Sequence, residues 1–177
     1  MNPPVAADPH AVDPLDPLDP LDVAAFWRAC RAALPELPEP APEAWAFGAT
    51  PEHADSLLAL VLDGTKTGTA SSLWDLEHAG EPMPEPGLLN LILDGRGAPR
   101  ALLETTAVAV VPFRDVGAEH AFAEGEGDRS LSDWRETHEH FWRTYAVDPR
   151  GFAPGMPIVC ERFRLRYPVP GVAPSGD

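Results

Sequence analysis

The sequence predicts an α+β fold, in which helices are interspersed among antiparallel strands. Apolar residues recur at helical spacing after Thr50 and after Ser130, and strand-like segments span residues 88–93, 101–113 and 158–167. The turn sequence Asp94-Gly95-Arg96-Gly97 lies between the first two of these segments, as in a hairpin. This order of elements differs from the regular alternation of strands and helices that builds a wound parallel sheet.

The length of 177 residues and the hydrophobic content of 44% suit one compact domain with tails. The Asp-Pro-Leu repeat places a proline at every third position, which predicts an extended, flexible arm. A short amphipathic helix and a proline-rich linker should follow, with Asp22 as the helix cap. We expect four segments, namely the arm 1–22, the helix and linker 23–44, the folded domain 45–168 and a flexible tail 169–177.

Each predicted element has a local signal. Thr50-Pro51 starts a helix and Gly64 ends it, with a buried stripe of Ala54, Leu57, Leu58, Val61 and Leu62. A second long helix starts at Ser130 and places on one face Trp134, His138, Phe141 and Tyr145. The N-terminal helix has one apolar face, which packs on the domain itself or meets a partner. Packing on the domain is favoured, because so short a helix is marginal alone in water.

A formal charge of −15 disfavours DNA, long RNA and anionic membranes as partners. Cys30 and Cys160 show no disulfide or zinc spacing, and neither a secretory signal nor a membrane-spanning run is evident. We therefore expect a cytoplasmic protein without a membrane anchor. The sequence leaves the oligomeric state open.

Lys66 is the single lysine in a chain with twelve arginines, and it lies in a hydroxyl-rich segment. A desolvated lysine can lose its proton and act as a general base, whereas arginine keeps its proton. In a continuous strand Thr67 and Thr69 would share one face and Lys66 the other, but a bend at Gly68 would bring Lys66 and Thr69 together. Ordinary threonines in a turn are the alternative interpretation.

Several acidic residues are candidates for the site because they lie next to threonines or glycines that indicate a particular backbone conformation. Glu104 precedes two threonines in a strand, and glycines alternate with Glu124, Glu126 and Asp128. This alternation suits either a loop that converges carboxylates on a cation or substrate, or a solvated acidic loop that caps the next helix. His138 and His140 are two residues apart and do not share a helix face, so a metal site there is disfavoured.

Several of these segments together resemble the ASCH domain from about Phe47 to Tyr167. The matching motifs are Gly64-Thr65-Lys66-Thr67-Gly68-Thr69, Glu104-Thr105-Thr106, Val111-Pro112-Phe113 and Glu124-Gly125-Glu126-Gly127-Asp128-Arg129-Ser130-Leu131. The resemblance implies a PUA-like fold, a small mixed or antiparallel β-barrel flanked by helices, here with an N-terminal helical extension. It also implies an association with RNA or modified nucleosides.

The resemblance further implies an activity and its residues. Some members are amidohydrolases of N4-acetylcytidine with a Lys, Thr and Glu set, which falls here on Lys66, Thr69 and Glu126, with Glu126 favoured over Glu124 as the glutamate. In that mechanism the lysine activates the threonine for attack on an amide carbonyl. No cofactor is expected. The residues expected to contact the substrate are Thr67, Ser71, Trp74, Glu104 and Glu124, although a core position is the favoured interpretation of Trp74.

Two other functions stay open. The first is a ribonuclease for single-stranded RNA, in which the acidic loop recruits a divalent metal ion and a basic stripe binds the backbone through Arg162, Arg164 and Arg166. The second is a non-catalytic adaptor that binds RNA or a nucleoside. We therefore expect a modified nucleoside or short single-stranded RNA as partner, and a hydrolase as the leading interpretation.

Overall fold

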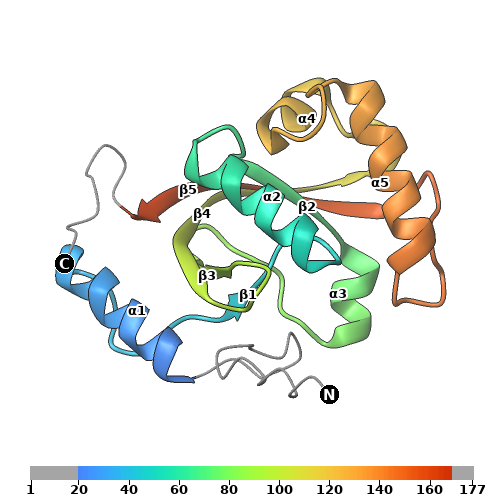
Figure 1. The fold of residues 1–177 in the computed structure, drawn as a ribbon. Helices are drawn as coiled ribbons and strands as arrows, with labels where there is room; N and C mark the ends of the chain where they lie inside the picture. The colour runs from blue at the N-terminus through green and yellow to red at the C-terminus, as the bar shows by residue number, and fades with distance from the viewer. Residues whose placement is uncertain (1–19, 169–177) are drawn as a thin grey trace, which may run out of the picture.

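The computed structural model describes residues 20–168, with side chains from residue 23. Its centre is a five-stranded mixed sheet in the order β1-β3-β4-β5-β2 (Figure 1). β1 pairs in parallel with β3, and the other neighbours are antiparallel. The strands are β1 (Ala44–Trp45), β2 (Gly68–Ser72), β3 (Leu89–Leu93), β4 (Pro99–Pro112) and β5 (Pro157–Tyr167).

Helices surround this sheet. α1 lies beside the end of β5, whereas α5 lies beside its beginning and α4 is next to α5 (Figure 1). A single 3-10 turn, η1, links β4 to α4. The bounds are α1 (Pro20–Ala33), α2 (Pro51–Leu62), α3 (Leu73–Ala79), η1 (Phe113–Asp115), α4 (Ala118–Glu124) and α5 (Leu131–Tyr145).

The predicted hairpin is present between β3 and β4. Leu93 is opposite Pro99, and the Asp94 carboxylate accepts hydrogen bonds from the backbone amides of Arg96 and Ala98, both at 2.9 Å. The aspartate therefore fixes the turn through local acceptor geometry, as turn-forming aspartates commonly do. β4 then pairs along most of its length with β5, and β2 adds to the other edge of β5.

The two long predicted helices are confirmed with small corrections. The Thr50 hydroxyl accepts from the His53 amide at 3.2 Å and starts α2, and the Ser130 hydroxyl accepts from the Asp133 amide at 3.1 Å and starts α5. Leu62 and Tyr145, predicted to be in the buried stripes, are 43% and 48% exposed. Both lie in the last turn of their helices, where the apolar face has passed the edge of the core.

The N-terminal helix packs on its own domain, as favoured from the sequence. Trp27 and Cys30 are buried in a core with Leu91 and Leu102, and the Trp27 indole donates to the Glu39 carbonyl at 3.0 Å. The predicted start was wrong, because α1 begins at Pro20 and not after Asp22. Proline is tolerated in the first turn, where its missing N–H has no helical partner. The rest of the predicted arm, and the tail, lie outside the described residues.

The α+β class is confirmed, with an open sheet where the sequence predicted a barrel. In the described part of the chain β1 and β2 are the edges of the sheet and do not pair with each other. Among the helices of residues 20–168, none has the length and apolar character required to cross a bilayer.

We expect Trp27→Ala to lower the free energy of unfolding by about 3–5 kcal/mol, because it empties a buried site between α1 and the sheet. Chemical denaturation measures this value. The exposed neighbour Arg28 is the matched control, and Arg28→Ala should change stability by no more than about 0.5 kcal/mol. Equal, small effects of the two variants would contradict the docking of α1.

Candidate functional site

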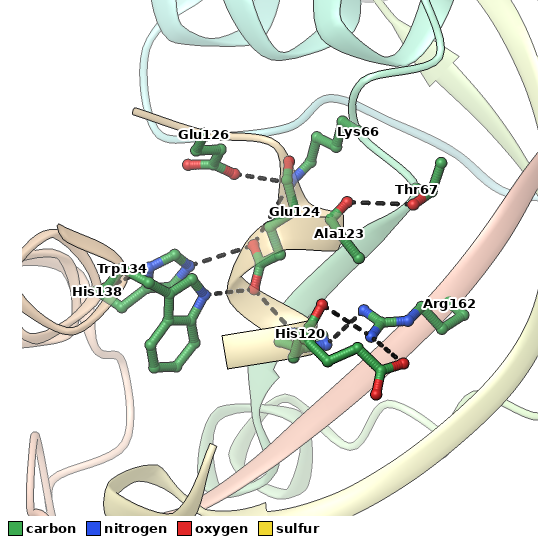
Figure 2. A network of polar contacts seen from close by, with 10 residues as sticks. Lys66, Thr67, His120, Ala123, Glu124, Glu126, Trp134, His138 and Arg162 are labelled. Carbon is green, nitrogen blue, oxygen red and sulfur yellow. Dashed lines mark hydrogen bonds and ion pairs between the residues drawn. The ribbon is translucent and has the colours of Figure 1, made fainter. Parts of the chain in front are cut away.

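Lys66 follows the end of α2 and is held at both sides by backbone hydrogen bonds. Its own amide donates to the Leu60 carbonyl at 2.9 Å, and the next amide, that of Thr67, donates to the Ala123 carbonyl of α4 at 2.7 Å. The side chain is only 1% exposed. Its Nζ lies 2.7 Å from Glu126 Oε1 and 3.4 Å from Glu124 Oε2 (Figure 2). The lysine therefore forms a buried ion pair with two carboxylates.

Glycines in the loop after α4 permit this arrangement. Gly125 has φ +73°, and a Cβ built there would lie 2.6 Å from the Thr65 carbonyl oxygen. Gly127 has φ +54°, and its Cβ would meet the Asp133 carboxylate. A residue with a Cβ would be costly at either position, because of both the left-handed backbone and the close approach. The alternation of glycine and glutamate thus brings both carboxylates against the Lys66 segment.

Glu124 is the centre of the polar network (Figure 2). Its Oε1 accepts from Trp134 Nε1 at 2.7 Å and lies 2.9 Å from His120 Nε2. Its Oε2 faces His138 Nε2 at 3.3 Å and Lys66 Nζ at 3.4 Å. Burial alone would raise the pKa of this carboxyl, but the two histidines and Lys66 outweigh it and hold the pKa well below its ordinary value. Glu124 is therefore a buried carboxylate anion.

His120 has a defined tautomer. Arg162 Nη1 lies 3.0 Å from His120 Nδ1, and because a guanidinium can only donate, Nδ1 must be the acceptor. The ring proton is then on Nε2, the atom that faces Glu124. The contact between His120 Nε2 and Glu124 Oε1 is short but poorly aligned for a hydrogen bond, so it stabilises the carboxylate mainly through electrostatics. Gly68 gives Arg162 its room, since a Cβ there would lie 2.9 Å from Nη1.

His138 belongs to α5 and is the network member that faces Glu124 Oε2 together with Lys66. Its ring stacks on Trp134 with centroids 4.2 Å apart, and its Nδ1 lies 2.9 Å from the Trp134 carbonyl oxygen. Burial alone would lower the pKa of His138, but the Glu124 carboxylate raises it above its ordinary value, and Glu126 adds to this effect. Together α4 and α5 thus supply a carboxylate and an imidazole to the site.

A cavity of about 80 Å³ opens beside this network. Four of the residues predicted for the site line it, namely Lys66, Thr69, Glu124 and Glu126. Lys66 and Thr69 thus face the same space, as the bend alternative predicted, although Gly68 is itself the first paired residue of β2 and Lys66 precedes the strand. The rest of the lining is largely apolar or aromatic and consists of Phe47, Gly48, His53, Leu57, Ala70, Thr137, His138, Phe141 and Trp142.

Four other predicted contact residues lie away from this cavity. Thr67 is exposed and its hydroxyl donates to the Ala123 carbonyl at 3.3 Å, and Ser71 is further along β2. Trp74 packs against the core, with the Arg150 guanidinium 4.6 Å from its ring centroid. Glu104 on β4 forms ion pairs with Arg164 and Arg166 of β5 instead. Substrate contacts by these four residues are not favoured by the geometry.

The predicted basic stripe is neutralised by neighbouring carboxylates. Arg164 pairs with Glu104 at 3.0 Å, and Arg166 pairs with both Glu104 and Glu36. Arg162 is directed to His120 and to Glu119. In addition, no group of three metal-ligating side chains is arranged for a metal ion in residues 20–168. The arginines that the ribonuclease interpretation assigned to the RNA backbone are therefore already paired within the protein.

Sequence reasoning missed the histidine partners of the site. His120 and Glu124 are four residues apart on α4, a spacing that places side chains on one helix face and was available as a signal. His138 was considered as a member of a buried stripe and as a disfavoured metal ligand, and nothing local links it to Glu124. The aromatic residues of the cavity had no distinguishing pattern.

We expect Gly125→Ala to destabilise the protein more than Gly64→Ala, measured as the free energy of unfolding. Both glycines have a positive φ, +73° and +83°, so both variants should lose about 1–2 kcal/mol from backbone strain. Only Gly125 faces another backbone segment, and a Cβ at Gly64 meets nothing within 4 Å. The crowding should cost a further ~1–3 kcal/mol. Equal losses would show that the close approach to Thr65 is unimportant.

Comparisons with known proteins agree with this architecture. Protein EF3133 from Enterococcus faecalis V583 has a similar structure, with a TM-score of 0.74, 33% identity, and coverage of 83% of this chain and 91% of that chain. An ASCH domain from Lactobacillus crispatus JV V101 gives a TM-score of 0.74 at 24% identity, covering 86% of this chain and 98% of that chain. A comparison with curated protein sequences finds no significant match.

The family assignment comes from the sequence itself. The model of the ASCH domain matches residues 43–167, which comprise β1 to β5 and the whole cavity but exclude α1. ASCH domains are PUA-like and are associated with RNA binding. The chain is therefore a member of the ASCH domain family with an additional N-terminal helix.

Proposed function

We propose that this protein hydrolyses the amide of an N4-acylated cytidine, with Thr69 as nucleophile, Lys66 as its base and Glu126 as the proton carrier. The observation that carries the proposal is the presence of these three side chains around one cavity, with Lys66 buried and 2.7 Å from Glu126. A threonine hydroxyl needs a base before it can attack a carbonyl, and a desolvated lysine is suited to that role.

The two glutamates have different roles in this proposal. Glu124 is 1% exposed, and its two oxygens are surrounded by four protein partners. Glu126 contacts Lys66 through Oε1 and is 19% exposed, so it can reach both the lysine and a ligand in the cavity. Proton transfer therefore falls to Glu126. Glu124, first considered as a substrate contact, holds Lys66 in place.

The reaction balances as follows. Lys66 gives a proton to Glu126, and the neutral amine then takes the proton of the Thr69 hydroxyl as its oxygen attacks the acyl carbon. The bond from that carbon to N4 breaks, and Glu126 returns its proton to N4, so cytidine leaves. Water then attacks the acyl-Thr69 ester with Glu126 as base, and Lys66 protonates the departing threonine oxygen. A final transfer from Glu126 to Lys66 restores the ion pair and releases the carboxylic acid.

The size and lining of the cavity favour one base rather than an oligonucleotide. Its volume of about 80 Å³ is well below the roughly 300–1,000 Å³ of typical ligand pockets. It can therefore receive the acylated edge of a pyrimidine while the sugar stays outside. No arginine is among the residues that line it, and its lysine is already paired with carboxylates. A phosphate would find no free cation there.

We expect purified protein to release cytidine from N4-acetylcytidine, measured by chromatography. Lys66→Met, Thr69→Val and Glu126→Gln should each lower kcat/KM by about 10²-fold or more, because each removes a group that moves a proton or forms the acyl intermediate. Thr144→Val changes an exposed threonine on α5 by the same substitution and should keep full activity.

Three outcomes separate the candidate functions. No cytidine from the wild type would contradict the proposal for this substrate. Cleavage of single-stranded RNA that requires a divalent metal would instead support the ribonuclease. Nucleoside binding without turnover, which Lys66→Arg tolerates, would support the adaptor, because that variant keeps the charge and removes only the titration.

A further inference from the structure

We propose that His138 is a positioning residue, which as an imidazolium holds the Glu124 carboxylate and through it directs Lys66 toward Glu126. The inference rests on the proposed function for its consequence in catalysis. Its physical content concerns the charge state of one histidine and the response of one lysine, and both can be measured without any substrate.

The groups around the His138 ring favour a proton on both ring nitrogens. Nδ1 lies 2.9 Å from the Trp134 carbonyl oxygen, which only accepts, so Nδ1 carries a hydrogen. Nε2 faces Glu124 Oε2 at 3.3 Å, and an unprotonated Nε2 would set its lone pair against that carboxylate. His138 is 9% exposed, so water does not screen this repulsion effectively. Protonation of both nitrogens removes it.

Charge balance gives His138 its influence on Lys66. The site contains two anions, Glu124 and Glu126, and two cations, Lys66 and the His138 imidazolium. His120 adds a dipole and no charge, because Arg162 occupies its Nδ1 as a donor. If His138 loses its proton, Lys66 is the remaining cation facing Glu124. The ammonium is then drawn toward Glu124 and gives up its proton to Glu126 less readily.

The groups that face His138 come from three elements. Glu124 and Glu126 belong to α4 and the loop after it, Lys66 follows α2, and His53 on α2 lines the same cavity. The carboxylates raise the pKa of His138 in the folded protein, so the imidazolium persists above the ordinary histidine range near 6.5. The arrangement is therefore present at lower pH and is lost as pH rises through that raised pKa.

The single lysine makes the test direct. Protein grown with lysine labelled with ¹³C at Cε has one labelled side chain, which is Lys66. We expect its Cε resonance to shift in one step as pH is raised from 6 to 9, with a midpoint above 6.5. His138→Gln should abolish the step, because glutamine keeps a donor near Glu124 but does not titrate. His140→Gln, two residues further on the same helix and exposed, should leave it unchanged, as should His53→Gln.

Either of two results would overturn the inference. One is a wild-type Lys66 signal without a step in this range, a measurement that needs no variant to fold. The other is the same step in His138→Gln as in the wild type, or its loss in His53→Gln instead.

Hydrolysis of N4-acetylcytidine provides a separate measurement, in which kcat should fall with rising pH at the midpoint of the Lys66 step. His138→Gln should lack this alkaline decline. Absence of any hydrolysis would contradict the proposed function, while the pH dependence of the Lys66 Cε signal still decides the role of His138. Hydrolysis that is flat across the Lys66 step would contradict the positioning role and leave the proposed function intact.

Discussion

The buried carboxylate of Glu124 is the constraint on which the site depends. A charged group in the interior is costly unless it is paired and hydrogen-bonded, and this one has partners from three separate segments. Trp134 and His138 come from α5, His120 from α4 itself and Lys66 from the segment after α2. Removal of any one partner would leave part of the anion unbalanced. The carboxylate thus ties α4 and α5 to the edge strand β2, which starts two residues after Lys66.

Backbone geometry explains why this contact forms at the two glycine-rich motifs. The Thr67 amide donates a hydrogen bond to the Ala123 carbonyl, so the segment after α2 lies directly beside the end of α4. Gly125 allows the close approach at Thr65, and Gly68 makes room for the arginine that orients His120. The glycines of both motifs are therefore explained by backbone conformation and packing, without a role in chemistry. These glycines determine where the carboxylates and the lysine meet, whereas any chemistry depends on the side chains themselves.

The elements predicted correctly are those with a local signal. Thr50 and Ser130 cap their helices through their own hydroxyls, and Asp94 closes its turn, so a few neighbouring residues contain the information. The short elements β1, α3 and α4 were missed because two or seven residues show too little periodicity, although α3 does have local caps in Ser72 and Gly80. For the site, the motifs located Lys66, Thr69 and both glutamates. The roles of His138 and Arg162 arise from contacts between distant segments, which no spacing in the sequence encodes.

The choice of lysine at position 66 follows from the same geometry. Lys66 Nζ contacts Glu124 and Glu126 and also lies over the Phe47 ring, 5.3 Å from its centroid. An ammonium is a compact charge that can contact both carboxylates at once, whereas a guanidinium is a wider planar fork. An arginine would also keep its proton in any such setting, so it could not serve the proton transfer to Glu126 in the proposed mechanism. Under that proposal, small size and an exchangeable proton together account for the one lysine in a chain whose twelve other basic residues are all arginine.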